Sequence, residues 1–147
     1  MNTFGYSLLM LATGIGIPVM AVMNAKLAQS TGSTFLAVAC LSAVALLVTL
    51  CVLLRKPPSY ALLKEAPAYT FAAGFFFLFY IASITWVTPH FGISNAVFCV
   101  LLGQLIASAA LDRFGLMGLP VIALSPQRIA GICLMAIGLF LAIKTGK

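Results

Sequence analysis

The chain has 147 residues, of which 63% are hydrophobic and only 7% are charged, and its mean hydropathy is +1.19. A soluble domain carries roughly 25% charged residues, so this composition excludes a water-soluble protein and indicates that lipid solvates most of the surface. The eight basic residues stand singly or in twos at the ends of apolar runs, as membrane-flanking anchors do. Because no basic run is interleaved with aromatic residues, nucleic-acid binding is also disfavoured.

Apolar runs long enough to cross a bilayer follow one another along the whole chain. A helix needs about 20 apolar residues for one crossing, and the connections between the runs are too short for an independent catalytic domain. The sequence therefore predicts an all-α integral membrane protein in which residues 1–147 form a single transmembrane domain. Five spans are expected, at about residues 4–23, 34–54, 68–87, 93–111 and 126–143.

The first run contains three helix-perturbing residues, Gly14, Gly16 and Pro18. Pro18 removes one backbone hydrogen bond and crowds the carbonyl group of Gly14, so we expect a kink there. This span is expected to end at Asn24–Lys26. Since no lysine or arginine precedes it and it is long enough to span, we do not expect it to be a signal peptide.

The next two runs differ in composition. The second is almost entirely aliphatic and stops at Arg55–Pro58, whereas the third follows Pro67 and is rich in aromatic residues. Proline is tolerated in the first turn of a helix. The segment Thr88–Gly92 is interpreted as a tight connection, which predicts that spans three and four are antiparallel neighbours.

The fourth run carries a polar stripe. Gln104, Ser108 and Asp112 are spaced four residues apart and therefore share one helix face. Gly103 and Ala107 form a small-x-x-x-small pair that suits close approach of another helix. After this run, the segment 125–126 is Ser-Pro, which is typical of an N-cap followed by proline at the first helical position.

Polar groups inside a bilayer are costly and tend to face the bundle interior or a cavity. We predict a cavity with aromatic walls and a few polar contacts. Its candidate lining residues are Gln104, Ser108, Tyr80, Phe76, Ser83, Asn24 and Thr13. The alternative, in which a polar side chain only hydrogen-bonds a neighbouring helix, stays open for Gln104. It is favoured for the hydroxyl groups of Ser108, Ser83 and Thr13.

Three ionisable residues near span ends are candidates for coupling or for interfacial contacts. Asp112 lies next to Arg113, and a local interfacial ion pair between them is favoured over a coupling role. His90 is favoured as an interfacial polar residue over a proton-coupling residue. Because no Asp, Glu, Lys, Arg or His lies near the middle of a span, proton/cation exchange on a central carboxylate lacks its obvious residue.

Catalytic and metal-binding patterns are missing from the sequence. There is no paired-carboxylate constellation, no nucleophile–base pair and no phosphate-binding motif, so we do not predict an enzyme. The four cysteines lie inside apolar runs without C-x-x-C spacing or nearby histidines. We therefore infer neither disulfides nor a metal, and we expect no cofactor.

The flanking charges bear on orientation. The N-terminal face collects five basic residues, at positions 55, 56, 64, 113 and 128, and the opposite face collects three, at positions 26, 144 and 147. The positive-inside rule favours a cytoplasmic N-terminus, but the bias is weak. A small multi-span protein with so little bias could insert in both orientations.

Two stretches carry a family resemblance. One is the run from Gly14 to Lys26 followed by Gly32-Ser33; the other comprises Gly103–Ser108 and Asp112–Pro120. With glycines also at positions 131 and 138 in the last span, the chain resembles the small YdcZ-like proteins, inner-membrane exporters of the drug/metabolite transporter superfamily. The resemblance covers nearly the whole chain.

The resemblance implies a five-helix unit equivalent to one half of a ten-helix drug/metabolite transporter whose halves are inverted. Inverted repeats can form a site at their interface and alternate its access by rocking. A single five-helix chain would then pair with an oppositely oriented copy or a paralogue; we favour an antiparallel homodimer, and parallel association is its rival.

The function that follows is a secondary transporter, exporting a small amphipathic organic molecule or metabolite across the bacterial inner membrane by alternating access. A small dual-topology channel and an accessory subunit of a larger membrane protein are the alternatives. The substrate, the coupling ion and the direction of transport stay open.

Overall fold

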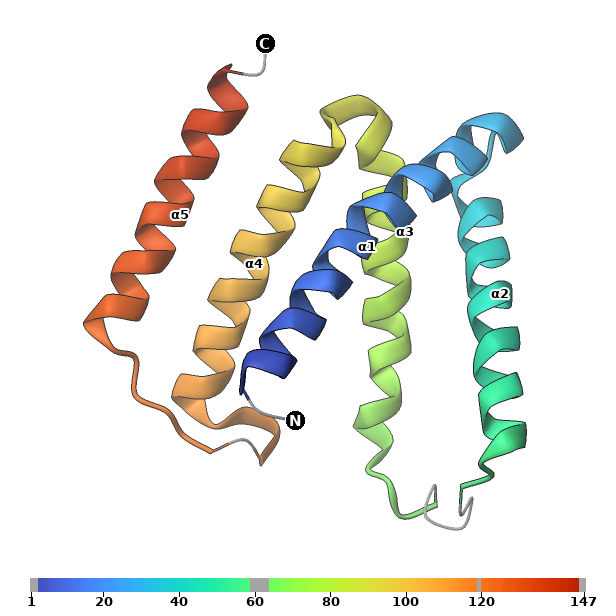
Figure 1. Ribbon diagram of the computed structural model, residues 1–147, viewed down its shortest axis with the longest axis horizontal. Coiled ribbons are helices and arrows are strands. Elements are labelled where there is room, and N and C mark those ends of the chain that lie inside the picture. Colours follow the sequence, from blue (N-terminus) through green and yellow to red (C-terminus); the bar gives the residue numbers. More distant parts are fainter. Residues whose placement is uncertain (1–2, 59–63, 119, 146–147) are drawn as a thin grey trace. The chain divides into compact units, whose positions relative to one another are not determined.

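The computed structural model describes residues 3–58, 64–118 and 120–145, with side chains up to residue 143. Lys147, one of the predicted flanking charges, and Leu119 lie outside the described residues. The described chain is helical, without strands (Figure 1). Its elements are α1 (Thr3–Thr31), α2 (Thr34–Arg55), the 3₁₀ turn η2 (Ala68–Ala72), α3 (Ala73–Phe91), α4 (Ile93–Phe114), the 3₁₀ turn η3 (Leu116–Gly118) and α5 (Pro126–Thr145).

Five helical segments among the described residues are long and apolar enough to cross a membrane, with η2 and α3 counted as one segment. A helix satisfies its own backbone hydrogen bonds, which an apolar solvent cannot do, so long apolar runs fold in this way in lipid. The predicted fold class, an all-α membrane protein with five spans, is confirmed.

α1 is longer than predicted. It does not end at Asn24–Lys26 but continues to Thr31, because Asn24 is buried and its side chain is bonded to another helix instead of competing for the backbone. Gly32, with φ of +69°, ends the helix, and Ser33 then caps α2 by accepting the N–H of Leu36 at 3.2 Å. The helix assignment is continuous through Pro18, and the kink there stays a prediction.

The predicted connection Thr88–Gly92 is also shorter than expected. α3 runs to Phe91 with Pro89 inside it, and only Gly92, at φ of +85°, separates it from α4. Side chains bond to backbone carbonyl groups in this last turn: the hydroxyl of Thr88 donates to the carbonyl of Ile84 at 2.6 Å. A proline near a helix end displaces few backbone hydrogen bonds, so the helix tolerates it.

Residues 1–90 form the first of two compact units. α1 packs against α2, and small residues on α1 let the helices approach closely. The buried side chains of this unit are Ala21, Asn24, Ala25, Ala28, Ala37, Val38, Ile81, Ile84 and Thr85. Its core is therefore narrow, largely aliphatic and interrupted by two polar residues.

Residues 91–147 form the second unit, in which α4 and α5 pack side by side and antiparallel (Figure 1). The backbone N–H of Ile122 donates to the carbonyl of Asp112 at 2.8 Å and ties the connecting segment to the end of α4. The predicted cap of the last helix is confirmed, since the hydroxyl of Ser125 accepts the N–H of Arg128 at 3.2 Å.

The outer surfaces of the helices are strongly apolar. In each spanning helix, at most 17% of the residues in an apolar stretch of 18 residues are buried. Large side chains such as Phe76 and Phe79 are about two-thirds exposed, at 66% and 64%. Water would solvate such a surface poorly. Lipid or another protein surface must therefore cover it.

Candidate polar pocket and the predicted site residues

Asn24 of α1 and Thr85 of α3 form a buried polar contact. The side-chain Nδ2 of Asn24 donates to the hydroxyl oxygen of Thr85 at 2.7 Å, and the two residues are only 5% and 1% exposed. A polar group taken out of water needs such a partner, because leaving it without a hydrogen bond costs about 1–3 kcal/mol. The predicted cavity residue Asn24 is therefore an anchor between two helices.

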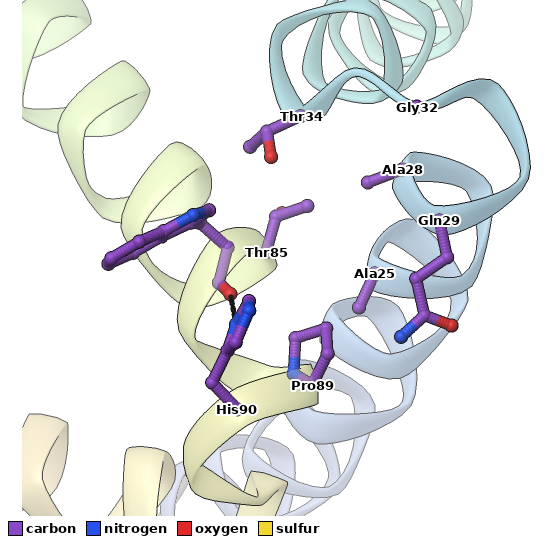
Figure 2. A pocket seen from close by; sticks show the side chains of 9 residues that line it. Ala25, Ala28, Gln29, Gly32, Thr34, Thr85, Pro89 and His90 are labelled. Atoms are coloured by element: carbon purple, nitrogen blue, oxygen red, sulfur yellow. Dashed lines mark hydrogen bonds between the residues drawn. The ribbon is translucent and has the colours of Figure 1, made fainter.

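An open pocket of about 250 Å³ adjoins this contact. It is formed by the last turns of α1, the first residue of α2 and the last turns of α3 (Figure 2). Its lining includes the polar side chains of Gln29, Thr34, Thr85 and His90. The helix ends thus gather several hydrogen-bonding side chains around one pocket.

The tautomer of His90 follows from its backbone contact. Nδ1 lies 2.8 Å from the carbonyl oxygen of Trp86, the contact drawn as a dashed line in Figure 2. Because a carbonyl oxygen can only accept, Nδ1 must carry the hydrogen, and in the neutral ring Nε2 is then an acceptor. His90 lies in the last turn of α3 and not in a loop as predicted.

A second hollow, of about 560 Å³, lies beside the first and shares Trp86 with it. Ser83 lines this hollow together with residues 32–35 at the start of α2. Trp86 therefore lines both hollows, one together with Ser83 and the other together with the newly found residues of the first pocket.

The other predicted site residues of the first unit differ in burial and in hydrogen bonding. The hydroxyl of Tyr80 is buried and has no hydrogen-bond partner among the described residues. Phe76 is 66% exposed. Thr13 is exposed and donates to the carbonyl of Leu9 in its own helix at 3.0 Å, so the structure shows its hydroxyl bonded locally and not to a neighbouring helix.

In the second unit, the Gln104 side chain is exposed and makes no hydrogen bond with the described residues. The hydroxyl of Ser108 donates to the carbonyl of Leu105 in its own helix at 3.0 Å. A Cβ atom added to Gly103 would meet nothing within 4 Å, and Ala107 is exposed. Whether Gln104 and Ser108 line a cavity with Tyr80 and Phe76 stays a prediction.

The ion pair expected between Asp112 and Arg113 is wrong. Asp112 instead accepts a hydrogen bond from Arg128 of α5, with Nη1 and Oδ2 2.7 Å apart. Arg113 follows Asp112 by one residue and so points away by about 100° on the helix. The pair joins the end of α4 to the first turn of α5, and both side chains are partly exposed, Asp112 at 26% and Arg128 at 35%.

α4 and α5 also border an apolar groove of about 480 Å³, lined by Phe98, Leu101, Leu134 and Met135 among others. Its glycine-containing wall is formed by Gly131 and Gly138 of α5. No predicted polar site residue lies in this groove. Among the described residues, no group of three or more His, Cys, Asp or Glu gathers that could hold a metal ion.

Sequence reasoning missed Thr85, Gln29 and Thr34 as pocket residues. The available signal was Asn24 itself, since an amide inside a membrane helix needs a hydrogen-bond partner. Several hydroxyl residues on the other spans could have served equally well. The choice of Thr85 depends on how α1 and α3 cross, which side-chain spacing along one helix does not specify.

Comparison with known proteins adds one finding. A family model with the description "Putative inner membrane exporter, YdcZ" matches residues 5–141. The match reaches into each of the five membrane-spanning helices. No curated protein and no solved structure matches the chain.

Proposed function

Because the chain belongs to the YdcZ family of inner membrane exporters, we propose that it is a secondary transporter that exports a small amphipathic organic molecule by alternating access. The description of the family names an exporter and not an enzyme. Five long apolar helices support a multi-pass membrane protein. The observation that carries the proposal is that hydrogen-bonding groups are held within otherwise apolar spanning helices. Asn24 and Thr85 are buried there, and the hydroxyl of Tyr80 lacks a described partner.

The proposed working unit is a dimer, preferably of two oppositely oriented copies in a bacterial inner membrane. An odd number of spans places the two ends of the chain on opposite faces, and the flanking basic residues, five against three, favour neither orientation strongly. Two inverted copies can enclose a site between them and rock about it. The exposed Gly103 and Ala107 on α4 offer a surface that another helix can approach closely.

The substrate class is proposed from the candidate lining. Gln104 offers an amide donor and acceptor, Tyr80 a hydroxyl, and Phe76 an aromatic face. None of these three groups carries a charge near neutral pH, so a cavity built from them suits an amphipathic molecule and does not favour a strictly cationic one.

Transport by Gln104→Ala tests this proposal. The protein is reconstituted into vesicles, and uptake is followed for amphipathic amides, alcohols, carboxylates and amines that cross protein-free vesicles slowly. We expect saturable, gradient-driven uptake of at least one compound, and a reduction of about tenfold in Gln104→Ala, as the loss of one ligand hydrogen bond would give. Thermal stability and dimer content should not change, because the Gln104 side chain bonds to no described residue.

Gln127→Ala is the matched control, because Gln127 is an exposed amide in the first turn of α5. Uptake that never saturates and ignores gradients would instead indicate a channel. Loss of folded protein in Gln104→Ala would assign Gln104 to packing and remove it from the proposed site.

A further inference from the structure

We propose that the pocket at the ends of α1 and α3 binds an uncharged hydrogen-bonding group of a small amphipathic molecule, with Trp86 as its apolar wall. The side chains that carry this inference are Gln29, Thr34, Thr85, Trp86 and His90. Figure 2 shows Thr34 and Thr85 on two different helices, α2 and α3. Of these five residues, only His90 is among the candidate site residues predicted from the sequence.

Charge decides against an ionic ligand. The acidic residues of the chain, Glu65 and Asp112, are absent from the lining, so a cationic group would meet no counter-charge. The lining contains no lysine or arginine either, so an anionic group would not meet the counter-charge of a lysine or arginine there. A neutral amide or hydroxyl group avoids both penalties.

The hydrogen-bonding groups of the pocket are complementary to such a ligand. The hydroxyl oxygen of Thr85 already accepts from Asn24, which leaves its hydrogen free to donate. His90 uses Nδ1 on the carbonyl of Trp86, which leaves Nε2 to accept. Gln29 and Thr34 each supply both a donor and an acceptor. A ligand amide, with one acceptor oxygen and donor hydrogens, could be satisfied by these groups together.

Size and surroundings indicate that only part of the ligand enters. The volume of about 250 Å³ is below the range of roughly 300–1,000 Å³ that is typical of pockets for whole small molecules. Trp86 is 63% exposed and also borders the second hollow. The apolar remainder of the ligand can therefore lie along the indole ring while its polar group sits among the helix ends.

This inference deepens the proposed function and depends on it only for the statement that the bound molecule is exported. Binding itself can be measured separately, because Trp86 is the single tryptophan of the chain and its fluorescence reports on the pocket directly. The protein in lipid nanodiscs is titrated with three aliphatic probes of one chain length: pentanamide, pentanoate and pentylammonium.

Pentanamide should change the Trp86 emission saturably, and its Kd should be about tenfold lower than that of either charged probe. Gln29→Ala and His90→Ala should each raise the Kd for pentanamide about five- to tenfold, the loss expected for one hydrogen bond. Both side chains are exposed, so both variants should fold. Gln127→Ala on α5 is the control and should bind as the unaltered protein does.

The inference is overturned if none of the probes gives a saturable change, if a charged probe binds more tightly, or if both pocket variants bind pentanamide normally. Any of these results would leave Trp86 as a residue of the membrane interface alone. Saturable binding without vesicle uptake would retain the pocket and contradict the transporter. Uptake with no Trp86 response would retain the transporter and contradict the pocket.

Discussion

Asn24 and Thr85 bring two polar side chains into the core of a helical unit whose other buried residues are alanine, valine and isoleucine. In water such a pair would add little, because each group could bond to solvent instead. Within membrane helices, competition from water is removed, yet measured contributions stay modest because the unfolded chain also finds partners. The 2.7 Å contact therefore acts mainly by fixing which faces of α1 and α3 meet.

A double-mutant cycle measures this contact. Asn24→Leu and Thr85→Val should each destabilise the protein, and the coupling energy between them should be about 0.6 kcal/mol and at most about 1.7 kcal/mol. Unfolding in mixed micelles with increasing SDS provides the free energies. Thr13→Val is the control, because that exposed hydroxyl bonds only within its own helix. Additive effects of the two substitutions would contradict the contact.

Removing a polar group at Tyr80 should, unlike at Asn24 or Thr85, not destabilise the protein. Its hydroxyl is buried without a described partner, and such a group costs about 1–3 kcal/mol. Tyr80→Phe should therefore leave the thermal stability unchanged or raise it, while lowering substrate uptake in vesicles. Lower stability with normal uptake would show that the hydroxyl has a structural partner, for instance in a second copy of the chain.

At this scale the sequence predicts which polar residues are unusual within apolar spans, but it does not predict their contacts. Asn24, Tyr80 and Ser83 were selected because polar groups are rare in apolar spans, and each has a distinctive setting in the structure. Gln29 and Thr34 stand near helix ends, where polar residues are ordinary, so the sequence alone does not single them out. Their significance depends on three helix ends meeting, which is a property of tertiary packing.

At the scale of elements, the connection between α4 and α5 is organised by Asp112. Its carboxylate binds Arg128 and its backbone carbonyl accepts the N–H of Ile122. Arg128 lies in the first turn of α5, where the helix dipole disfavours a cation, and Asp112 lies at the end of α4, where it disfavours an anion. The ion pair offsets two unfavourable placements.

Exchanging the two charges should therefore be well tolerated. Asp112→Asn and Arg128→Gln should each lower the stability by about 1 kcal/mol or less, since both side chains are partly exposed. The double variant Asp112→Arg/Arg128→Asp should recover or exceed the original stability, because both charges then suit the helix dipoles. Limited proteolysis between residues 115 and 125 provides the measurement, with Arg113→Gln as control. A double variant cleaved faster than either single variant would contradict this account.

Helix ends were predicted well where strong local signals occur and poorly where polar residues lie inside helices. Arg55 and the Ser125-Pro126 cap agree with the ends of α2 and the start of α5. Asn24 and Thr88 were interpreted as residues outside a helix, but their side chains are bonded to Thr85 and to the carbonyl of Ile84. A side chain that finds a partner no longer competes with the helical backbone.

At the scale of the whole molecule, the apolar outer surface follows directly from composition. With 63% hydrophobic residues and little of each spanning helix buried, the chain needs lipid or another protein around it. Composition and run lengths therefore predict the class and the number of spans. Composition and run lengths do not predict which partner chain completes a transport path, because that depends on orientation in the membrane and on contacts between chains.

The proposed transporter consists of two oppositely inserted copies, and the orientation of the chain in the membrane tests this directly. A single cysteine is placed at Gly146, outside the described residues, in a background where Cys40, Cys51, Cys99 and Cys133 are replaced by alanine. Intact cells are then labelled with a membrane-impermeant thiol reagent. The account predicts partial labelling that becomes complete only after the membrane is opened, since both orientations should be present. Complete labelling of intact cells, or no labelling until the membrane is opened, would contradict the antiparallel homodimer.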